Sequence, residues 1–359
     1  MTTAQRVRRA SLATVAALVI GGSGVAIGAA ATDSSASGTR AAATATAAPG
    51  PATPGPGSYA SVVRQVLPSV VLIRTENGLG SGVVLDRSGN IVTNAHVAGD
   101  ATKFQVQVAG DTAPRSARLV GSYPPDDLAV IRVGNPAGLQ PATFGDSDTV
   151  QAGDVVLAIG NPLGLSGSVT QGIISATDRA VTEPSADGSP AATLPGASQT
   201  SAPINPGNSG GALVTTSGQV VGIPTLAAGS PQGGGQAQGI GFAIPSNLAR
   251  DIATQIIDTG HVTSSHRAAL GAQVATVLGA DGATGGVGVV AVTSGGGAER
   301  AGLRPGDVIK AVGGAPTPDA TALTQALAAA EPGDQVSVTI SRDGQDRDVQ
   351  VTLGELPGS

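Results

Sequence analysis

The sequence predicts an all-β domain of antiparallel barrels or a sandwich, followed by a small α+β unit. Glycine (54 residues) and proline (24 residues) are abundant in the 359-residue chain, and helix-favouring charged runs are few. Short runs of valine, isoleucine and leucine recur between turn-forming residues, which is typical of strands joined by tight turns. With three Phe, two Tyr and no Trp, the cores must be built from aliphatic side chains.

The first segment has the pattern of a targeting element. Arg6, Arg8 and Arg9 precede an uncharged run at residues 10–32. A cleaved secretory signal peptide and an uncleaved membrane anchor share this pattern, and both alternatives stay open for residues 1–32. Either one places the remainder of the chain outside the cytoplasm, because the positive charge stays on the cytoplasmic side.

A linker and two folded parts follow. Residues 33–57 contain Ala, Thr, Ser, Gly and Pro with almost no large apolar side chain. Such a segment buries too little apolar surface to fold, so we predict a disordered linker. The remaining chain divides into a domain at residues 58–260 and a second unit at residues 267–357.

The domain at residues 58–260 carries the strand pattern. Phe104, Val106 and Val108 alternate with glutamines, as in a half-buried strand. Residues 87–90 separate two apolar runs and predict a hairpin turn. Further strands are predicted at the aliphatic clusters of residues 70–73, 83–85, 91–92, 128–131, 155–159 and 220–223.

One helix is predicted to close this domain. Leu248, Ile252 and Ile256 recur every four residues, with Ser246 placed as N-cap and Gly260 as C-cap. The second unit has the size of a small binding module. Its predicted strands lie at residues 287–292, 308–312, 336–340 and 349–352, and its one good helix lies at residues 320–330.

Charge and composition exclude several kinds of function. The net charge of −6 argues against nucleic acid as the main partner, since backbone phosphates demand a basic surface. The absence of cysteine excludes disulfides, cysteine-based metal sites and a thiol nucleophile.

Three local sequences together predict a serine hydrolase. His96 follows a predicted strand, the pair Asp126-Asp127 precedes another, and Ser209 lies in a glycine-rich loop. A serine hydroxyl needs a base to take its proton and a carboxylate to orient that base. Adjacent strand residues point to opposite faces, so alternation alone leaves open which of the two aspartates serves.

The glycines around Ser209 predict an oxyanion hole formed by Gly207, Asn208 and Ser209. They allow a tight backbone turn in which the N–H groups of Gly207 and Ser209 point at the developing oxyanion. The order His, Asp, Ser along the chain is that of chymotrypsin.

A rival interpretation is the nucleophile elbow of α/β-hydrolases, because residues 207–211 also fit Gly-x-Ser-x-Gly. Its other members would be Asp251 or Asp258 and His261 or His266. An elbow requires a helix directly after the serine, whereas residues 212–221 predict strand, turn and strand. We therefore disfavour the elbow and interpret both of these histidines as solvated linker residues.

The chain resembles the HtrA/DegP family of chymotrypsin-like serine proteases. The matching stretches are residues 80–83 (Gly-Ser-Gly-Val), 93–97, 127–130, 158–164, 204–213 and 239–245. The resemblance implies a chymotrypsin-like double β-barrel with its site in the cleft between the barrels. It also implies that Asp127, which precedes Leu-Ala, is the catalytic carboxylate.

The same resemblance implies a substrate pocket for small aliphatic side chains and a C-terminal PDZ domain. The pocket residues would be Ile204, Gly239, Ile240, Gly241, Phe242 and Ala243. The PDZ resemblance is clearest at residues 301–309. A PDZ domain captures a peptide C-terminus by strand addition. By position, its carboxylate-binding loop would be Ala269, Leu270, Gly271 and Ala272.

Three features depart from the family pattern. Residues 201–203 are Ser-Ala-Pro, where Asp-Ala-Ala is usual, and Ala272 is smaller than the usual apolar residue. Tyr59 is the one candidate for the N-terminal aromatic contacts of family trimers, so a homotrimer is implied on limited grounds.

We therefore expect an exported endopeptidase that cleaves unfolded or damaged proteins and needs no metal or organic cofactor. Its PDZ domain would bind peptide C-termini and regulate the protease. The alternative is a proteolytically silent PDZ scaffold or chaperone.

Overall fold

The computed structural model describes residues 58–76, 78–161, 167–183, 192–205, 207–229, 236–278 and 284–358. The expected targeting segment at residues 1–32 and the linker at residues 33–57 lie outside the described residues. Among the helices of the described part, none is long and apolar enough to span a membrane.

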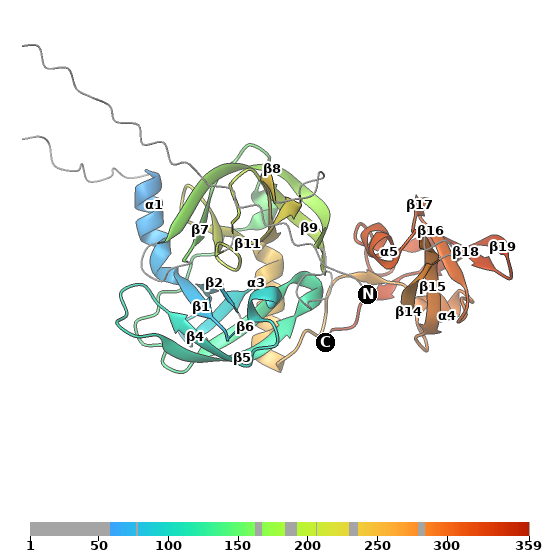
Figure 1. Cartoon of the computed structure of the whole chain (residues 1–359), viewed down its shortest axis with the longest axis horizontal. Coiled ribbons are helices and arrows are strands. Elements are labelled where there is room, and N and C mark those ends of the chain that lie inside the picture. The colour runs from blue at the N-terminus through green and yellow to red at the C-terminus, as the bar shows by residue number, and fades with distance from the viewer. Residues whose placement is uncertain are drawn as a thin grey trace, which may run out of the picture. The chain divides into compact units, whose positions relative to one another are not determined.

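The first of two closed β-barrels, drawn in blue to teal in Figure 1, has the strand order β1-β2-β3-β6-β5-β4. All of its neighbouring strands pair antiparallel. The strands are β1 (Val70–Arg74), β2 (Leu79–Val84), β3 (Asn90–Thr93), β4 (Lys103–Gln107), β5 (Arg115–Tyr123) and β6 (Leu128–Val133).

The second barrel repeats this plan with the order β10-β11-β12-β9-β8-β7. Its strands are β7 (Val155–Gly160), β8 (Ser168–Glu183), β9 (Ala192–Thr200), β10 (Ala212–Thr215), β11 (Val220–Gly229) and β12 (Gln236–Pro245). The predicted double β-barrel is confirmed. The sequence did not predict β5, β8, β9 and β12, whose described residues are mostly not in aliphatic runs.

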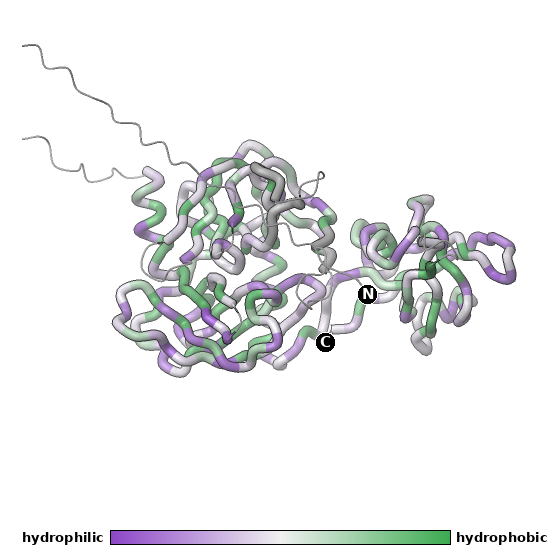
Figure 2. The backbone as a smooth tube through the Cα atoms, viewed as in Figure 1, coloured by the Kyte–Doolittle hydropathy of each residue, from purple (hydrophilic) through white to green (hydrophobic). Residues whose placement is uncertain are grey.

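One apolar core joins the two barrels. It combines fully buried residues of the first barrel, such as Val70 and Val130, with Leu157 and Ile159 of the second. The core is aliphatic, as predicted, and removing its apolar area from water favours a fixed arrangement of the barrels. Figure 2 shows hydrophobic residues interspersed with hydrophilic ones along the strands.

Helix α3 (Ser246–Thr259) packs on this shared core and contacts strands of both barrels. Gly260 is its C-cap with a φ of 85°, as predicted. The predicted N-cap is wrong, since Pro245 takes that position. Ser246 is instead fully buried, and its hydroxyl donates to the Gly145 carbonyl at 2.9 Å.

Helix α1 (Tyr59–Val66) lies where the sequence analysis expected strand and turn. Ser58 caps it by accepting from the Ser61 amide, and Val62 and Val66 bury one face in the shared core. Four-residue periodicity at Val62 and Val66 was the available signal.

The second unit has its own core and a sheet of order β14-β15-β16-β18-β19. Its main strands are β14 (Ala272–Leu278), β15 (Thr284–Val292), β16 (Val308–Val312), β18 (Gln335–Arg342) and β19 (Gln345–Thr352). Short strands β13 (Ala268–Ala269) and β20 (Gly354–Glu355) pair with each other, and β17 (Ala315–Pro316) pairs with β16. Helices are α4 (Gly297–Arg300) and α5 (Ala320–Leu327), the latter ending earlier than predicted at its C-cap Ala328.

Candidate active site

His96 lies on the short helix α2 (Ala95–Ala98), directly after β3. Its Nδ1 atom is 3.0 Å from Asp127 Oδ1 and 2.9 Å from Oδ2. The His96 backbone amide also donates to Asp127 Oδ1, at 2.9 Å. A carboxylate only accepts hydrogen bonds, so this contact favours the tautomer with the proton on Nδ1 and the lone pair on Nε2. That is the tautomer a general base needs.

Asp127 follows the 3₁₀ turn η2 (Pro124–Asp126) and precedes β6. Its backbone is left-handed, with φ 50° and ψ 42°, which Asp tolerates better than most residues. Its carbonyl accepts from the Ala95 amide at 3.0 Å and from Asn94 Nδ2 at 3.1 Å. These hydrogen bonds hold the turn at Asp127 against the segment that carries His96.

Ser209 is connected to Asp127 through Thr225 on β11. The Ser209 hydroxyl donates to the Thr225 carbonyl at 2.9 Å, and the Thr225 hydroxyl donates to Asp127 Oδ2 at 2.5 Å. Thr225 is only 3% exposed. His96, Asp127 and Ser209, which come from both barrels, are thus joined through one buried threonine. The sequence analysis missed Thr225, and a polar residue following an apolar strand run was its only signal.

Loss of the Thr225 hydroxyl is expected to slow catalysis without weakening substrate binding. In Thr225→Val one Asp127 lone pair loses its donor, and a hydrogen bond to a charged group contributes about 1.5–3 kcal/mol. We expect kcat to fall about 10- to 100-fold on a peptide substrate, with KM unchanged. Ser246→Ala is the control, because this hydroxyl is also buried but donates to the Gly145 carbonyl. An unchanged kcat in Thr225→Val would contradict this role.

Asp126 points elsewhere and pairs with Arg267. Its Oδ1 atom is 3.0 Å from Arg267 Nη1, which also donates to the Pro125 carbonyl at 2.6 Å. Burial raises the pKa of Asp126 from 3.8 to about 6, and the nearby Arg267 and His266 side chains only partly offset this. The geometry therefore answers the question that alternation left open: Asp127, and not Asp126, contacts His96.

This raised pKa makes stability depend on pH. Asp126 binds its proton more tightly in the folded state, so its stabilising contribution is complete below pH 3.8 and is lost as pH rises to about 6. A shift of this size corresponds to about 3 kcal/mol. We expect the unfolding free energy of the Asp126→Asn variant to gain about that amount relative to wild type between pH 4 and 7. Denaturant titrations of both proteins across this range measure it, and parallel pH profiles would contradict it.

The oxyanion loop surrounds Ser209. Gly207 has a φ of 103°, which favours glycine. The Asn208 amide, which lies between the other two predicted donors in the sequence, donates to the Asn205 carbonyl at 3.0 Å. Among the backbone hydrogen bonds of the described residues, none has the Gly207 or Ser209 amide as donor.

The predicted pocket residues divide into two sets. Ile204 and Ala243 share one buried cluster, and a Cβ at Gly241 would lie 2.4 Å from Ile204 Cγ1. Phe242 points into the shared barrel core and Ile240 is 37% exposed. Of the predicted pocket residues, Ile204 and Ala243 thus share a cluster, and Gly241 lies against Ile204. The sixth predicted pocket residue, Gly239, is exposed and has a φ of 74°.

The unusual serine beside this pocket has a clear partner. Ser201 Oγ accepts from the Ile173 amide at 3.0 Å, and the Ser201 amide donates to the Ile173 carbonyl at 3.0 Å. A neutral side chain therefore fastens this segment to β8.

The predicted PDZ loop joins β13 to β14. Ala269 pairs with Gly354, Leu270 is 4% exposed, Gly271 has a φ of 73°, and Ala272 begins β14. The Leu270 and Gly271 carbonyls accept from amides of residues 298 and 293, at 2.7 and 2.8 Å. Since β14 is an edge strand of its sheet, it can accept an added peptide strand.

The other two histidines have partners elsewhere. His261 Nδ1 is 3.2 Å from the Thr259 carbonyl, and His266 Nε2 is 3.4 Å from Asp251 on the surface. The residues after Ser209 form the strand β10, so the nucleophile elbow, already disfavoured, is excluded. Within the described ranges, no group of three or more His, Asp or Glu side chains is arranged to hold a metal ion.

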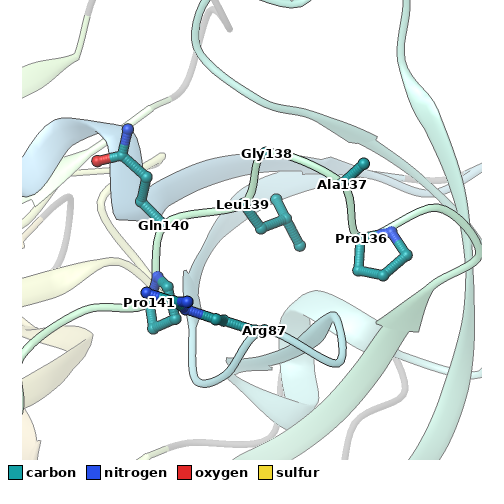
Figure 3. Close-up of a pocket in the computed structure, with 7 residues that line it drawn as sticks. All are labelled: Arg87, Pro136, Ala137, Gly138, Leu139, Gln140 and Pro141. Carbon is teal, nitrogen blue, oxygen red and sulfur yellow. The ribbon is translucent and has the colours of Figure 1, made fainter.

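A surface pocket lies away from these residues. It is lined by Arg87 and by residues 136–141, and it contains none of the predicted site residues. Figure 3 shows Leu139 and Gln140 pointing to different sides of the loop that forms its rim.

Comparison with known protein families agrees with this geometry. A family model described as a trypsin-like peptidase domain matches residues 80–223, and one described as a PDZ domain matches residues 268–353.

Relatives with curated names point the same way. The chain is 42% identical to the serine protease PepD of Mycobacterium tuberculosis, over 83% of this chain and 66% of PepD. It is 35% identical to the periplasmic pH-dependent serine endoprotease DegQ of Escherichia coli, over 82% of this chain and 70% of DegQ. It is 37% identical to the serine endoprotease DegS of Salmonella typhimurium, over 84% of this chain and 87% of DegS.

Solved structures are also similar. The HtrA-type protease AlgW with a decapeptide is 34% identical, with a TM-score of 0.55, 84% of this chain and 99% of that chain covered. The serine endoprotease from Yersinia pestis is 36% identical, with a TM-score of 0.55, 85% of this chain and 100% of that chain covered. The chain therefore belongs to the HtrA/DegP family of serine proteases, with a trypsin-like peptidase domain followed by a PDZ domain.

Proposed function

We propose that the chain hydrolyses peptide bonds with His96, Asp127 and Ser209 as its triad. The Ser209 hydroxyl turns from the Thr225 carbonyl toward His96, and His96 Nε2 takes its proton as the Ser209 oxygen attacks the substrate carbonyl. His96 then gives that proton to the leaving amine. In the second half of the reaction His96 takes a proton from water, which attacks the acyl group, and returns a proton to the Ser209 oxygen. Asp127 keeps the imidazole oriented and stabilises its charged form. The observation that supports this most is the Thr225 link between Asp127 and Ser209, together with the His96–Asp127 contact.

The substrates we propose are unfolded or damaged proteins with small aliphatic residues at the cleavage position. The Ile204 side chain fills the space beside Gly241, and Ala243 adds little bulk, so the wall they form is apolar. An apolar wall favours aliphatic side chains, and Ile204 leaves little room for large ones.

The PDZ domain is proposed to bind peptide C-termini along β14, with their carboxylate at residues 269–272. Such binding would shift the protease between inactive and active forms. We further propose an extracytoplasmic location, which the periplasmic relatives support. A homotrimer is proposed because Tyr59, at the start of α1, is 44% exposed.

Incubation of the full chain with casein and with a tightly folded protein tests this function. We expect casein to be digested, cleavage to follow small aliphatic residues, and a fluorophosphonate to modify the chain once. A silent PDZ scaffold would leave casein intact and ignore the reagent. Intact casein together with an unmodified chain would therefore contradict the proposal.

A further inference from the structure

Ser81 of β2 makes four buried hydrogen bonds, two of them to the oxyanion loop of the other barrel. Its hydroxyl donates to the Gly207 carbonyl at 2.6 Å and accepts from the Asn161 amide at 2.8 Å. Its amide donates to the Ser209 carbonyl at 2.9 Å, and its carbonyl accepts from the Thr93 hydroxyl at 2.7 Å. Ser81 is fully buried, so these bonds are shielded from water.

The two contacts to the loop fix alternate peptide planes. The Gly207–Asn208 plane is held by Ser81 at its carbonyl and by Asn205 at its amide. The Ser209–Gly210 plane is held by Ser81 at its carbonyl and by Pro224 at its amide, at 2.9 Å. Between them lies the plane that carries the Ser209 amide. Because peptide units are rigid and planar, fixing both neighbours restricts the direction of this amide.

The oxyanion loop is closely packed against β2 and β7. A Cβ at Gly210 would lie 2.2 Å from the Ser81 carbonyl oxygen, and one at Gly160 would lie 2.6 Å from the Gly207 carbonyl oxygen. The Gly207 carbonyl therefore lies against β7 and β2, where the Ser81 hydroxyl is its donor. Without that hydroxyl, a buried carbonyl and the buried Asn161 amide would both lack a partner, which favours rotation of the Gly207–Asn208 plane.

We propose that Ser81 is a positioning residue that holds the oxyanion loop of the second barrel in its transition-state-binding form. The inference rests on the proposed function, because it assumes that Gly207 and Ser209 bind the oxyanion. A donor helps catalysis only if it already points at the developing charge, and loss of one donor costs about 10² to 10³ in kcat. Removing the hydrogen bond that holds the loop to the first barrel is expected to cause part of this loss in kcat.

The test compares Ser81→Ala with Ser246→Ala in the full chain. Ser246 is the matched control, since it is also fully buried and its hydroxyl also donates to a glycine carbonyl, that of Gly145, away from the loop. The measurements are kcat and KM on a peptide p-nitroanilide, the inhibition constant of a peptide boronate, and the melting temperature. A boronate forms a tetrahedral adduct on serine and so reports the oxyanion site.

We expect Ser81→Ala to lose about 10- to 100-fold in kcat and a similar factor in boronate affinity, with KM unchanged. Ser246→Ala should lower the melting temperature but leave kcat and the boronate affinity unchanged. Equal losses of kcat in the two variants, or unchanged kcat and boronate affinity in Ser81→Ala, would overturn the inference.

A second variant and the activity of the wild type complete the test. If Ser81→Ala does not fold, Ser81→Cys replaces it, because a thiol is similar in size but a weaker donor. An intermediate kcat at constant KM supports the inference, and a wild-type kcat overturns it. Wild-type protein that cleaves neither casein nor the p-nitroanilide and is not modified by a fluorophosphonate refutes the proposed function. An active wild type with an equally active Ser81→Ala refutes only the role of Ser81.

Discussion

Ser209→Ala is expected to lower kcat on a peptide substrate by about 10⁶-fold. The Thr225 carbonyl that now accepts from the Ser209 hydroxyl would lose its donor, and the chain would lose its proposed nucleophile. KM should change little, because the proposed pocket wall at Ile204, Gly241 and Ala243 is untouched. The residual rate would reflect binding and the oxyanion loop alone.

Folding must be separated from chemistry in this experiment. The Ser209 residue is only part-buried, so its truncation removes few contacts. We expect the melting temperature of Ser209→Ala to match the wild type and fluorophosphonate labelling to vanish. A variant that keeps labelling, or keeps more than a small part of its activity, would show that the nucleophile lies elsewhere.

Asp127→Asn is expected to lower kcat by about 10⁴-fold near neutral pH. Asparagine has the same shape, but its amide can present N–H groups where the carboxylate presented two acceptors to His96 Nδ1 and to the Thr225 hydroxyl. His96 would then favour the tautomer with the proton on Nε2, which cannot accept from Ser209. The substituted residue also no longer stabilises the imidazolium that forms during the reaction.

The neighbouring aspartate supplies the control. Asp126→Asn makes the same chemical change one residue earlier, where the side chain pairs with Arg267 instead of His96. We expect this variant to retain most of its kcat at neutral pH. Equal losses of kcat in the two variants would mean that the whole turn, rather than the Asp127 carboxylate, carries the effect.

The sequence contained enough information for the fold class because strand periodicity is local. The alternating residues at 103–107 form β4, and the run at residues 155–159 forms β7. The helix α1 escaped notice because it is short and its apolar stripe consists of valines, which also favour strands. The wrong N-cap at Ser246 has a tertiary cause, since its hydroxyl bonds to Gly145 in a distant segment.

Only the site residues that stand in recognisable local sequence motifs could be predicted. His96 and Ser209 stand in recognisable local sequences, but the choice of Asp127 over Asp126 depended on a family resemblance, and its physical basis is a left-handed turn. Thr225 and Ser81 act through contacts between residues far apart in the sequence. No periodicity encodes such contacts, so they became visible only in the structure.

A crystal structure of the fluorophosphonate-labelled full chain tests the convergence of the three side chains most directly. We expect phosphorus bonded to Ser209 Oγ, a phosphoryl oxygen between the Gly207 and Ser209 amides, and the His96 ring within hydrogen-bonding reach of the adduct while Nδ1 still contacts Asp127. An adduct on another residue, or a His96 ring turned away from both Ser209 and Asp127, would contradict the account.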